Sequence, residues 1–79
     1  MNSLDLHGLT IEEAIPKIDH FLFQLLQQKA RDGRIITGKG SGKIQKATIA
    51  YLEQGGYTWH YERFANGKDN PGALIVHID

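Results

Sequence analysis

The sequence predicts an α+β fold in which two helices cover one face of a four-stranded mixed sheet. Two long segments repeat apolar residues every three or four positions, and four shorter segments are alternating or rich in β-branched and aromatic residues. Their order is β-α-β-α-β-β, which favours a two-layer sandwich with right-handed crossovers. The length of 79 residues suits one small domain, so we expect a single domain over residues 1–79.

Composition narrows the class of protein further. The chain has no cysteine, which excludes disulfides and thiolate metal sites and is typical of a cytoplasmic protein. No apolar run approaches the roughly 18–20 residues that a membrane-spanning helix needs. Nine basic residues balance nine acidic ones, so net charge gives no argument for a nucleic-acid partner. The basic residues nevertheless lie near predicted loops, and a local basic patch on a neutral protein is consistent with such a partner.

The first strand and helix are predicted from local patterns. Residues 4–7 alternate apolar and polar, the period of a half-buried strand. Thr10 and Glu13 then form a capping-box pattern at the start of a helix expected over residues 11–30. Pro16 lies inside this helix, and because the apolar stripe continues past it we expect a tolerated kink.

The middle of the chain is predicted to run from helix to strand to helix. Residues 32–33, Asp-Gly, are expected to stop the first helix, and residues 34–37 to form a short buried strand. A glycine-rich loop follows, and the second helix is expected over residues 43–54, ended by two glycines.

The last third of the chain is predicted to be a pair of strands. Residues 57–64 are aromatic and alternating, and residues 73–78 are apolar and β-branched. Residues 65–72 between them hold Asn-Gly and Asn-Pro-Gly, which predict turns.

The loop between the second strand and the second helix is the first candidate site. Three glycines within five residues, Gly38, Gly40 and Gly42, allow backbone N–H groups to approach an anion beside a helix N-terminus. Our first hypothesis is that this loop holds a phosphate of a nucleic acid. It is not a Walker A loop, since the four-residue spacer and the Ser or Thr after the lysine are missing.

A second candidate site is predicted at the same edge of the sheet. If the first two strands are parallel, their carboxyl ends meet at the same edge of the sheet, so Asp5 and His7 lie beside the glycine loop. Open α/β sheets bind ligands at this edge. The two side chains are two residues apart and project to the same side, so the carboxylate can orient the imidazole. Histidine titrates near neutral pH and is a reasonable general acid or base.

These residues together resemble the small MutS-related (Smr) domain family. The resemblance is carried by three blocks, namely Leu-Asp-Leu-His-Gly-Leu-Thr at 4–10, Ile-Thr-Gly-Lys-Gly-Ser-Gly at 36–42 and Gly-Ala-Leu-Ile-Val at 72–76. It implies a sandwich like the C-terminal domain of translation initiation factor three. In that fold the sheet order is first, second, fourth, third, with the last strand antiparallel to the others.

The resemblance also implies nucleic-acid binding and, for several members, endonuclease activity. Some members nick DNA, and others cleave messenger RNA at stalled or collided ribosomes. The family's Asp-x-His corresponds to Asp5 and His7, the expected catalytic pair, and its loop to Gly38, Lys39 and Gly40. The full set of expected phosphate-binding residues is Thr37, Gly38, Lys39, Gly40, Gly42, Lys43, Lys46 and Arg63.

One departure from the family pattern leaves an alternative open. Many bacterial members carry a histidine where this chain has Thr37, and threonine cannot supply a proton at neutral pH. The alternative function is a non-catalytic module that binds DNA, RNA or the ribosome, and a weaker one is a small-anion or nucleotide site at the same loop. His77, His20 and His60 are expected to be structural or surface residues, and Trp59 and Tyr61 to pack.

The expected partners and cofactors follow from the same resemblance. The domain is expected to be a cytoplasmic monomer that binds nucleic acid, with ribosomes as a further partner. Cleavage of RNA through its 2′-hydroxyl needs no metal, whereas cleavage of DNA requires activated water and favours Mg or Mn held by Asp5. The sequence does not choose between these substrates.

Overall fold

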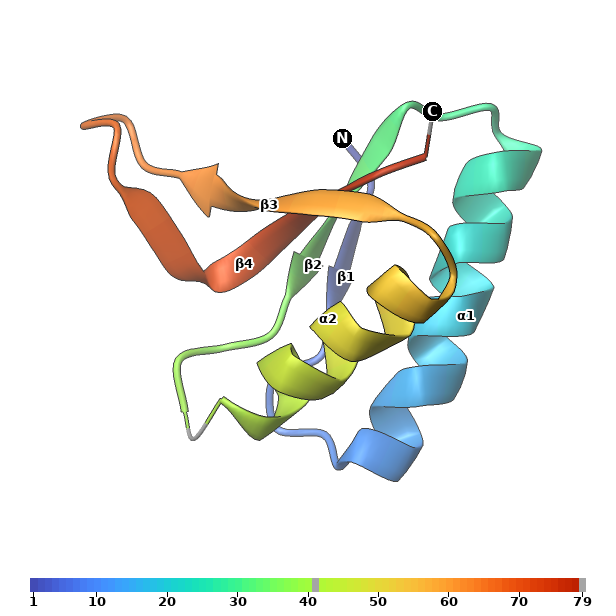
Figure 1. Cartoon of the computed structure of the whole chain (residues 1–79), viewed down its shortest axis with the longest axis horizontal. Helices are drawn as coiled ribbons and strands as arrows, with labels where there is room; N and C mark the ends of the chain where they lie inside the picture. Colours follow the sequence, from blue (N-terminus) through green and yellow to red (C-terminus); the bar gives the residue numbers. More distant parts are fainter. Residues whose placement is uncertain (41, 79) are drawn as a thin grey trace.

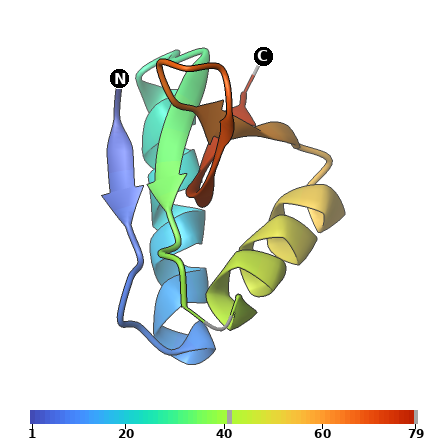
Figure 2. The ribbon, with the colours of Figure 1, turned by 90° about the vertical axis from the view of Figure 1, so that its left-hand side faces the viewer.

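The described part of the chain forms two helices and four strands, and both helices lie on one face of the sheet (Figures 1 and 2). The computed structural model describes residues 1–40 and 42–78. The elements are β1 (Ser3–Asp5), α1 (Ile11–Gln27), β2 (Asp32–Ile36), α2 (Lys43–Gln54), β3 (Thr58–Arg63) and β4 (Asp69–His77). The sheet order is β1-β2-β4-β3, with β1 and β2 parallel and β4 antiparallel to both its neighbours. The predicted fold class and strand order are confirmed.

The core fills the space between the sheet and the helices. Apolar side chains from both layers meet there, as the periods of two in the strands and about 3.6 in the helices require. The fully or almost fully buried members are Leu6, Ile35, Leu74 and Val76 of the sheet side, Ala14, Ile18, Leu22 and Leu25 of α1, and Leu52 of α2.

Helix α1 starts where the sequence predicts and ends three residues earlier. Thr10 Oγ1 accepts a hydrogen bond from the Glu13 N–H, and the Glu13 carboxylate accepts one from the Thr10 N–H, so the capping box is complete. The helix continues through Pro16. It ends at Gln27 rather than residue 30 because Lys29 takes a left-handed conformation, φ 56°, and Ala30 N–H donates back to Leu25 O.

The Asp-Gly pair at residues 32–33 was predicted to stop this helix, and that prediction is wrong. Both residues belong to β2. A Cβ built on Gly33 would lie 2.6 Å from Leu25 Cδ1 and 2.9 Å from the Phe21 ring. Glycine at this position therefore lets α1 pack directly onto the backbone of β2.

Strand β4 begins at Asp69, four residues before the predicted start. Its ladder with β3 pairs Tyr61 with Leu74 and then Glu62 with Asn70, so the register shifts between those pairs. The predicted Asn-Pro-Gly turn is thus an irregularity within β4, and the hairpin turn proper is confined to the residues between Arg63 and Asp69.

The face of the sheet away from the helices carries polar side chains. His60 and His77 stack there with ring centroids 4.7 Å apart, and His60 Nδ1 lies 2.7 Å from His77 Nε2. On the opposite face of β3, Trp59 packs partly buried against the core, edge-to-face with Tyr61 at 5.1 Å. Neither helix of the described chain is long and apolar enough to cross a membrane.

Candidate nucleic-acid site

The parallel pairing of β1 and β2 brings the two predicted halves of the site together. Asp5 pairs with Ile36, and Leu6 N–H donates to Ile36 O at 2.8 Å, so the segments that follow both strands leave the sheet at the same end (Figure 1). A Cβ built on Gly38 would be 3.4 Å from His7 Cβ. His7 and the loop line one open pocket of about 530 Å³, whose lining is completed by Gly8, Ile36, Lys43 and Ile44.

Asp5 and His7 form a hydrogen-bonded pair at this edge. His7 Nδ1 lies 2.7 Å from Asp5 Oδ1, and the same oxygen accepts the His7 backbone N–H at 3.0 Å. These hydrogen bonds, first that from the imidazole and then that from the backbone, hold the pKa of the Asp5 carboxyl below its usual range. An ionised Asp5 accepts from Nδ1–H, which leaves the lone pair on Nε2 of a ring whose side chain is 72% exposed.

The glycine loop divides into an anchored part and an open part. The N–H groups of Thr37 and Gly38 both donate to Gly72 O, at 2.9 and 3.1 Å, and Thr37 Oγ1 lies 3.5 Å from the same oxygen. Thr37 is 7% exposed, so its hydroxyl faces the protein interior. Within the described chain, the N–H groups of Lys39 and Gly40 donate to no other residue. These two amides are therefore available to donate hydrogen bonds to an anion.

The start of α2 adds positive potential next to that open part. Gly42, with φ 83°, is the N-cap residue and supplies no side-chain cap, and Lys46 N–H donates to its carbonyl. Lys43 and Lys46 lie in the first turn, which has no acidic side chain. First-turn N–H groups and the helix dipole favour an anion at this end. Ser41 lies outside the described residues.

The two remaining predicted cations differ in how they are held. Lys39 Nζ lies 5.7 Å from the centroid of the Phe64 ring, so the end of the β3–β4 hairpin contacts the loop through a cation–π interaction. Arg63 is exposed and its Nε lies 3.8 Å from Asp69 Oδ1 in a weak surface pair, and it is not among the described residues that line the pocket. Phe64 was not among the predicted site residues.

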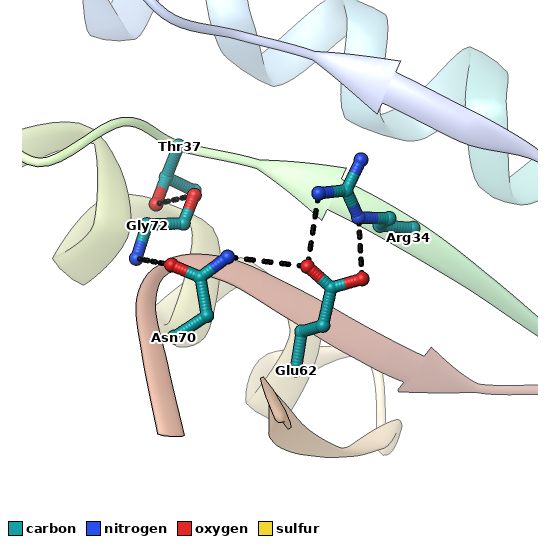
Figure 3. Close-up of polar contacts among 5 residues, drawn as sticks. All are labelled: Arg34, Thr37, Glu62, Asn70 and Gly72. Carbon is teal, nitrogen blue, oxygen red and sulfur yellow. Dashed lines mark hydrogen bonds and ion pairs between the residues drawn. The ribbon is translucent and has the colours of Figure 1, made fainter. Parts of the chain in front are cut away.

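Three further residues, which are connected to the loop by hydrogen bonds, were not predicted from the sequence. Arg34 makes a bidentate ion pair with Glu62, and Asn70 connects Glu62 to Gly72 (Figure 3). The hydrogen bond from Arg34 lowers the pKa of the Glu62 carboxyl, and the same bond raises the pKa of the Arg34 guanidinium. The one sequence signal was Asn70-Pro71-Gly72, which is turn chemistry and does not reveal a link to a distant strand.

The described side chains around Asp5 do not by themselves form a site for a divalent cation. Among the described residues no group of three or more His, Asp or Glu side chains is arranged to hold a metal ion. Asp5 offers a single carboxylate, and its Oδ1 already accepts two hydrogen bonds from His7. Mg²⁺ is commonly held by one or two carboxylates plus substrate phosphates, but these residues alone do not form such a centre.

Comparison with known proteins identifies relatives over nearly the whole chain. The model of the Smr domain family matches residues 4–79. "Endonuclease MutS2" of Streptococcus pyogenes serotype M1 is 34% identical over 73 residues, which are 92% of this chain and 9% of that protein. Its counterpart in Clostridium botulinum (strain Eklund 17B / Type B) is 31% identical over 77 residues, 98% of this chain and 10% of that protein. The chain therefore spans about a tenth of the length of these relatives.

Two solved structures share the fold. The Smr domain of Thermus thermophilus MutS2 has a TM-score of 0.82 and 25% sequence identity, covering 98% of this chain and 96% of that one. YdaL, a stand-alone small MutS-related protein from Escherichia coli, has a TM-score of 0.76 and 24% identity, covering 95% of this chain and 62% of that one. The β1-β2-β4-β3 sandwich is thus an architecture that solved Smr proteins adopt.

Proposed function

Since the chain belongs to the Smr domain family, we propose that it binds nucleic acid and cleaves a phosphodiester bond at the edge formed by Asp5, His7 and the glycine loop. The observation that carries this proposal is the Asp5–His7 hydrogen bond of 2.7 Å beside a loop whose Lys39 and Gly40 N–H groups have no partner among the described residues. The relatives named endonuclease MutS2 support the class of reaction.

The residues of the pocket have different roles in this proposal, phosphate binding for some and proton transfer for others. The Lys39 and Gly40 N–H groups and the cations of the first turn of α2 bind the scissile phosphate. Asp5 keeps the proton of His7 on Nδ1, and His7 Nε2 acts as the general base. The Thr37 side chain takes no part, since its hydroxyl faces Gly72 O.

With RNA, these residues are sufficient for a balanced step. Nε2 removes the proton of the 2′-hydroxyl, the 2′-oxygen attacks phosphorus, and the bond to the 5′-oxygen breaks. The leaving 5′-oxygen takes up a proton from water, so the products are a 2′,3′-cyclic phosphate and a 5′-hydroxyl. With DNA the nucleophile must be water, and a divalent cation beside Asp5 would assist its activation.

The test uses the His7→Ala variant with labelled RNA and labelled DNA, each with and without a chelator. Removal of a general base is expected to lower the cleavage rate by about 10²–10⁴-fold. Binding of the oligonucleotide is expected to stay within about threefold of wild type, because the phosphate contacts remain. His20→Ala on the exposed face of α1 is the matched control and is expected to cleave normally.

Thr37 favours a second candidate, a nucleic-acid or ribosome-binding module without catalysis. Many bacterial relatives are expected to place a histidine there, and this chain offers one imidazole at the pocket. Salt-sensitive binding with no cleavage of either substrate would contradict the enzyme hypothesis and support the non-catalytic binding module. Competition by a mononucleotide but not by an oligonucleotide would instead indicate a small-anion site.

A further inference from the structure

A continuous chain of hydrogen bonds crosses the open face of the sheet and ends at the glycine loop (Figure 3). It begins on β2, where Arg34 Nε donates to Glu62 Oε2 at 2.7 Å and Arg34 Nη2 donates to Glu62 Oε1 at 2.9 Å. Asn70 Nδ2 then donates to Glu62 Oε1 at 3.1 Å. The Arg34 and Glu62 side chains are only 32% and 28% exposed, so these charged hydrogen bonds are partly shielded from water.

Asn70 connects this ion pair to the loop. Its Oδ1 accepts the Gly72 N–H at 3.0 Å, and Gly72 O accepts the N–H groups of Thr37 and Gly38. Both ends of the Asn70 amide are therefore used, one toward the Arg34–Glu62 pair and one toward the segment that anchors the loop. The interior oxygen of Gly72 is where three donors of the loop converge.

The backbone around Gly72 needs this support because it leaves the regular ladder. The register shift in β4 lies between the pairs Tyr61–Leu74 and Glu62–Asn70, so residues 71–73 are outside regular pairing with β3. The Gln45 side chain donates to Pro71 O, which ties the same segment to α2. The position of Gly72 O is thus set by side chains as well as by the sheet.

We propose that Asn70 is a positioning residue of the phosphate site: held by Glu62 and Arg34, it fixes Gly72 O and so sets where the Lys39 and Gly40 amides lie relative to His7. The ligand is a phosphodiester of the nucleic acid, and this role rests on the function proposed above. The loop is pre-organised before substrate binds, which spares the cost of ordering it during binding.

The chain provides a matched control for removing this amide. Asn66 Oδ1 accepts the N–H of Lys68 at 3.0 Å, as Asn70 Oδ1 accepts the N–H of Gly72, in each case two residues later in the chain. Asn66 lies in the same hairpin but has no hydrogen bond to Glu62 among the described residues. In Asn70→Ala, amide hydrogen exchange of Thr37 and Gly38 is expected to accelerate about tenfold, since their shared acceptor is no longer held. The oligonucleotide dissociation constant and KM are expected to rise about tenfold through misplacement of the loop, with a smaller change in kcat. Asn66→Ala is expected to leave all of these unchanged.

Two further variants, which add a negative charge at residue 70 and then remove the one at residue 62, separate a positioning role from general damage to the hairpin. Asn70→Asp keeps an acceptor for Gly72 N–H but places a second carboxylate against Glu62, so it is expected to behave like Asn70→Ala. Adding Glu62→Gln to Asn70→Asp removes the second charge and turns the group at the Oε1 position into a donor toward residue 70, while Arg34 keeps only its acceptor at the Oε2 position. This double variant is expected to recover part of the wild-type exchange protection and KM.

The outcomes distinguish the two proposals. Unchanged exchange at Thr37 and Gly38 in Asn70→Ala, or equal effects in Asn66→Ala, would overturn the positioning role, as would a double variant without recovery. If the wild-type chain neither binds nor cleaves nucleic acid, the proposed function fails, and the exchange experiment still decides whether Asn70 holds the loop. If Asn70→Ala does not fold, the Asn70→Asp and double variants give the same decision.

Discussion

Single residues of the glycine loop have different backbone requirements. Gly38 has φ +80°, a conformation that L side chains rarely adopt, whereas Gly40 is outside that region and has open space around its Cα. A Cβ added at Gly38 would also lie 3.4 Å from His7 Cβ, so a side chain there would contact His7. The two glycines therefore provide a matched pair of substitutions.

Gly38→Ala is expected to lower the free energy of unfolding by about 1–2 kcal/mol, the cost of left-handed backbone for a residue with a Cβ. Gly40→Ala is expected to stay within about 0.5 kcal/mol of wild type, as surface substitutions usually do. Urea denaturation of the two variants measures the difference. Equal stability of both would show that the loop does not require the left-handed conformation at Gly38.

Packing of α1 against β2 determines where the first loop and the Asp5–His7 pair lie. The contact is close because Gly33 has no side chain between the strand and the Leu25 and Phe21 side chains. Both partners of this contact are buried in the core. A displacement of α1 would also move the segment between β1 and α1, which carries His7.

Gly33→Ala is expected to destabilise the fold by about 1–3 kcal/mol, because the added methyl overlaps Leu25 Cδ1 and the Phe21 ring. Thermal unfolding followed by circular dichroism would measure the loss, with Gly40→Ala as a control that adds the same methyl group in open space. A stability equal to that of the control would mean that α1 moves away from β2 at little cost.

The molecule as a whole is neutral, so any attraction for nucleic acid must come from the local arrangement of its charges. Lys39 and Lys43 line the pocket and Lys46 lies in the first turn of α2, while Asp19, Glu12 and Glu13 lie on α1. A small number of phosphate contacts predicts a shallow dependence of affinity on salt. It also predicts that removing one of these lysines has a measurable effect.

Lys46→Ala is expected to reduce the steepness of log affinity against log salt by about 0.7–0.9, the contribution of one phosphate contact. Lys17→Ala, an exposed lysine of α1, is the control and is expected to leave the slope unchanged. Fluorescence anisotropy with a labelled oligonucleotide at several salt concentrations measures both. Equal slopes for wild type and Lys46→Ala would place the nucleic acid away from the start of α2.

Much of the fold was predictable because its signals are local. The capping box of Thr10 and Glu13, the apolar stripe of α1 and the glycines around α2 each act within a few residues. The wrong predictions concern residues whose conformation depends on contacts with residues distant in the sequence. Residues 32–33 look like a helix stop in sequence, and their place in β2 depends on contacts with Phe21 and Leu25.

The location of the site could be predicted because the pairing of the first two strands could be predicted. Asp5, His7 and the glycine loop are named by their motifs, and parallel pairing of β1 with β2 is enough to place them side by side. The supporting residues were not predictable. Arg34 and Glu62 are 28 positions apart, and Thr37 and Gly72 are 35 apart, so their contacts exist only once β4 has paired with both of its neighbours.

The order of elements, the helix start and the residues of the Asp5–His7 pair and the loop were therefore specified by local sequence. Which amides of the loop are hydrogen-bonded was decided by packing, because Gly72 O accepts those of Thr37 and Gly38, whereas those of Lys39 and Gly40 have no partner among the described residues. The physical reason is that a backbone N–H must find a partner, and the partner here belongs to a strand brought alongside by long-range pairing.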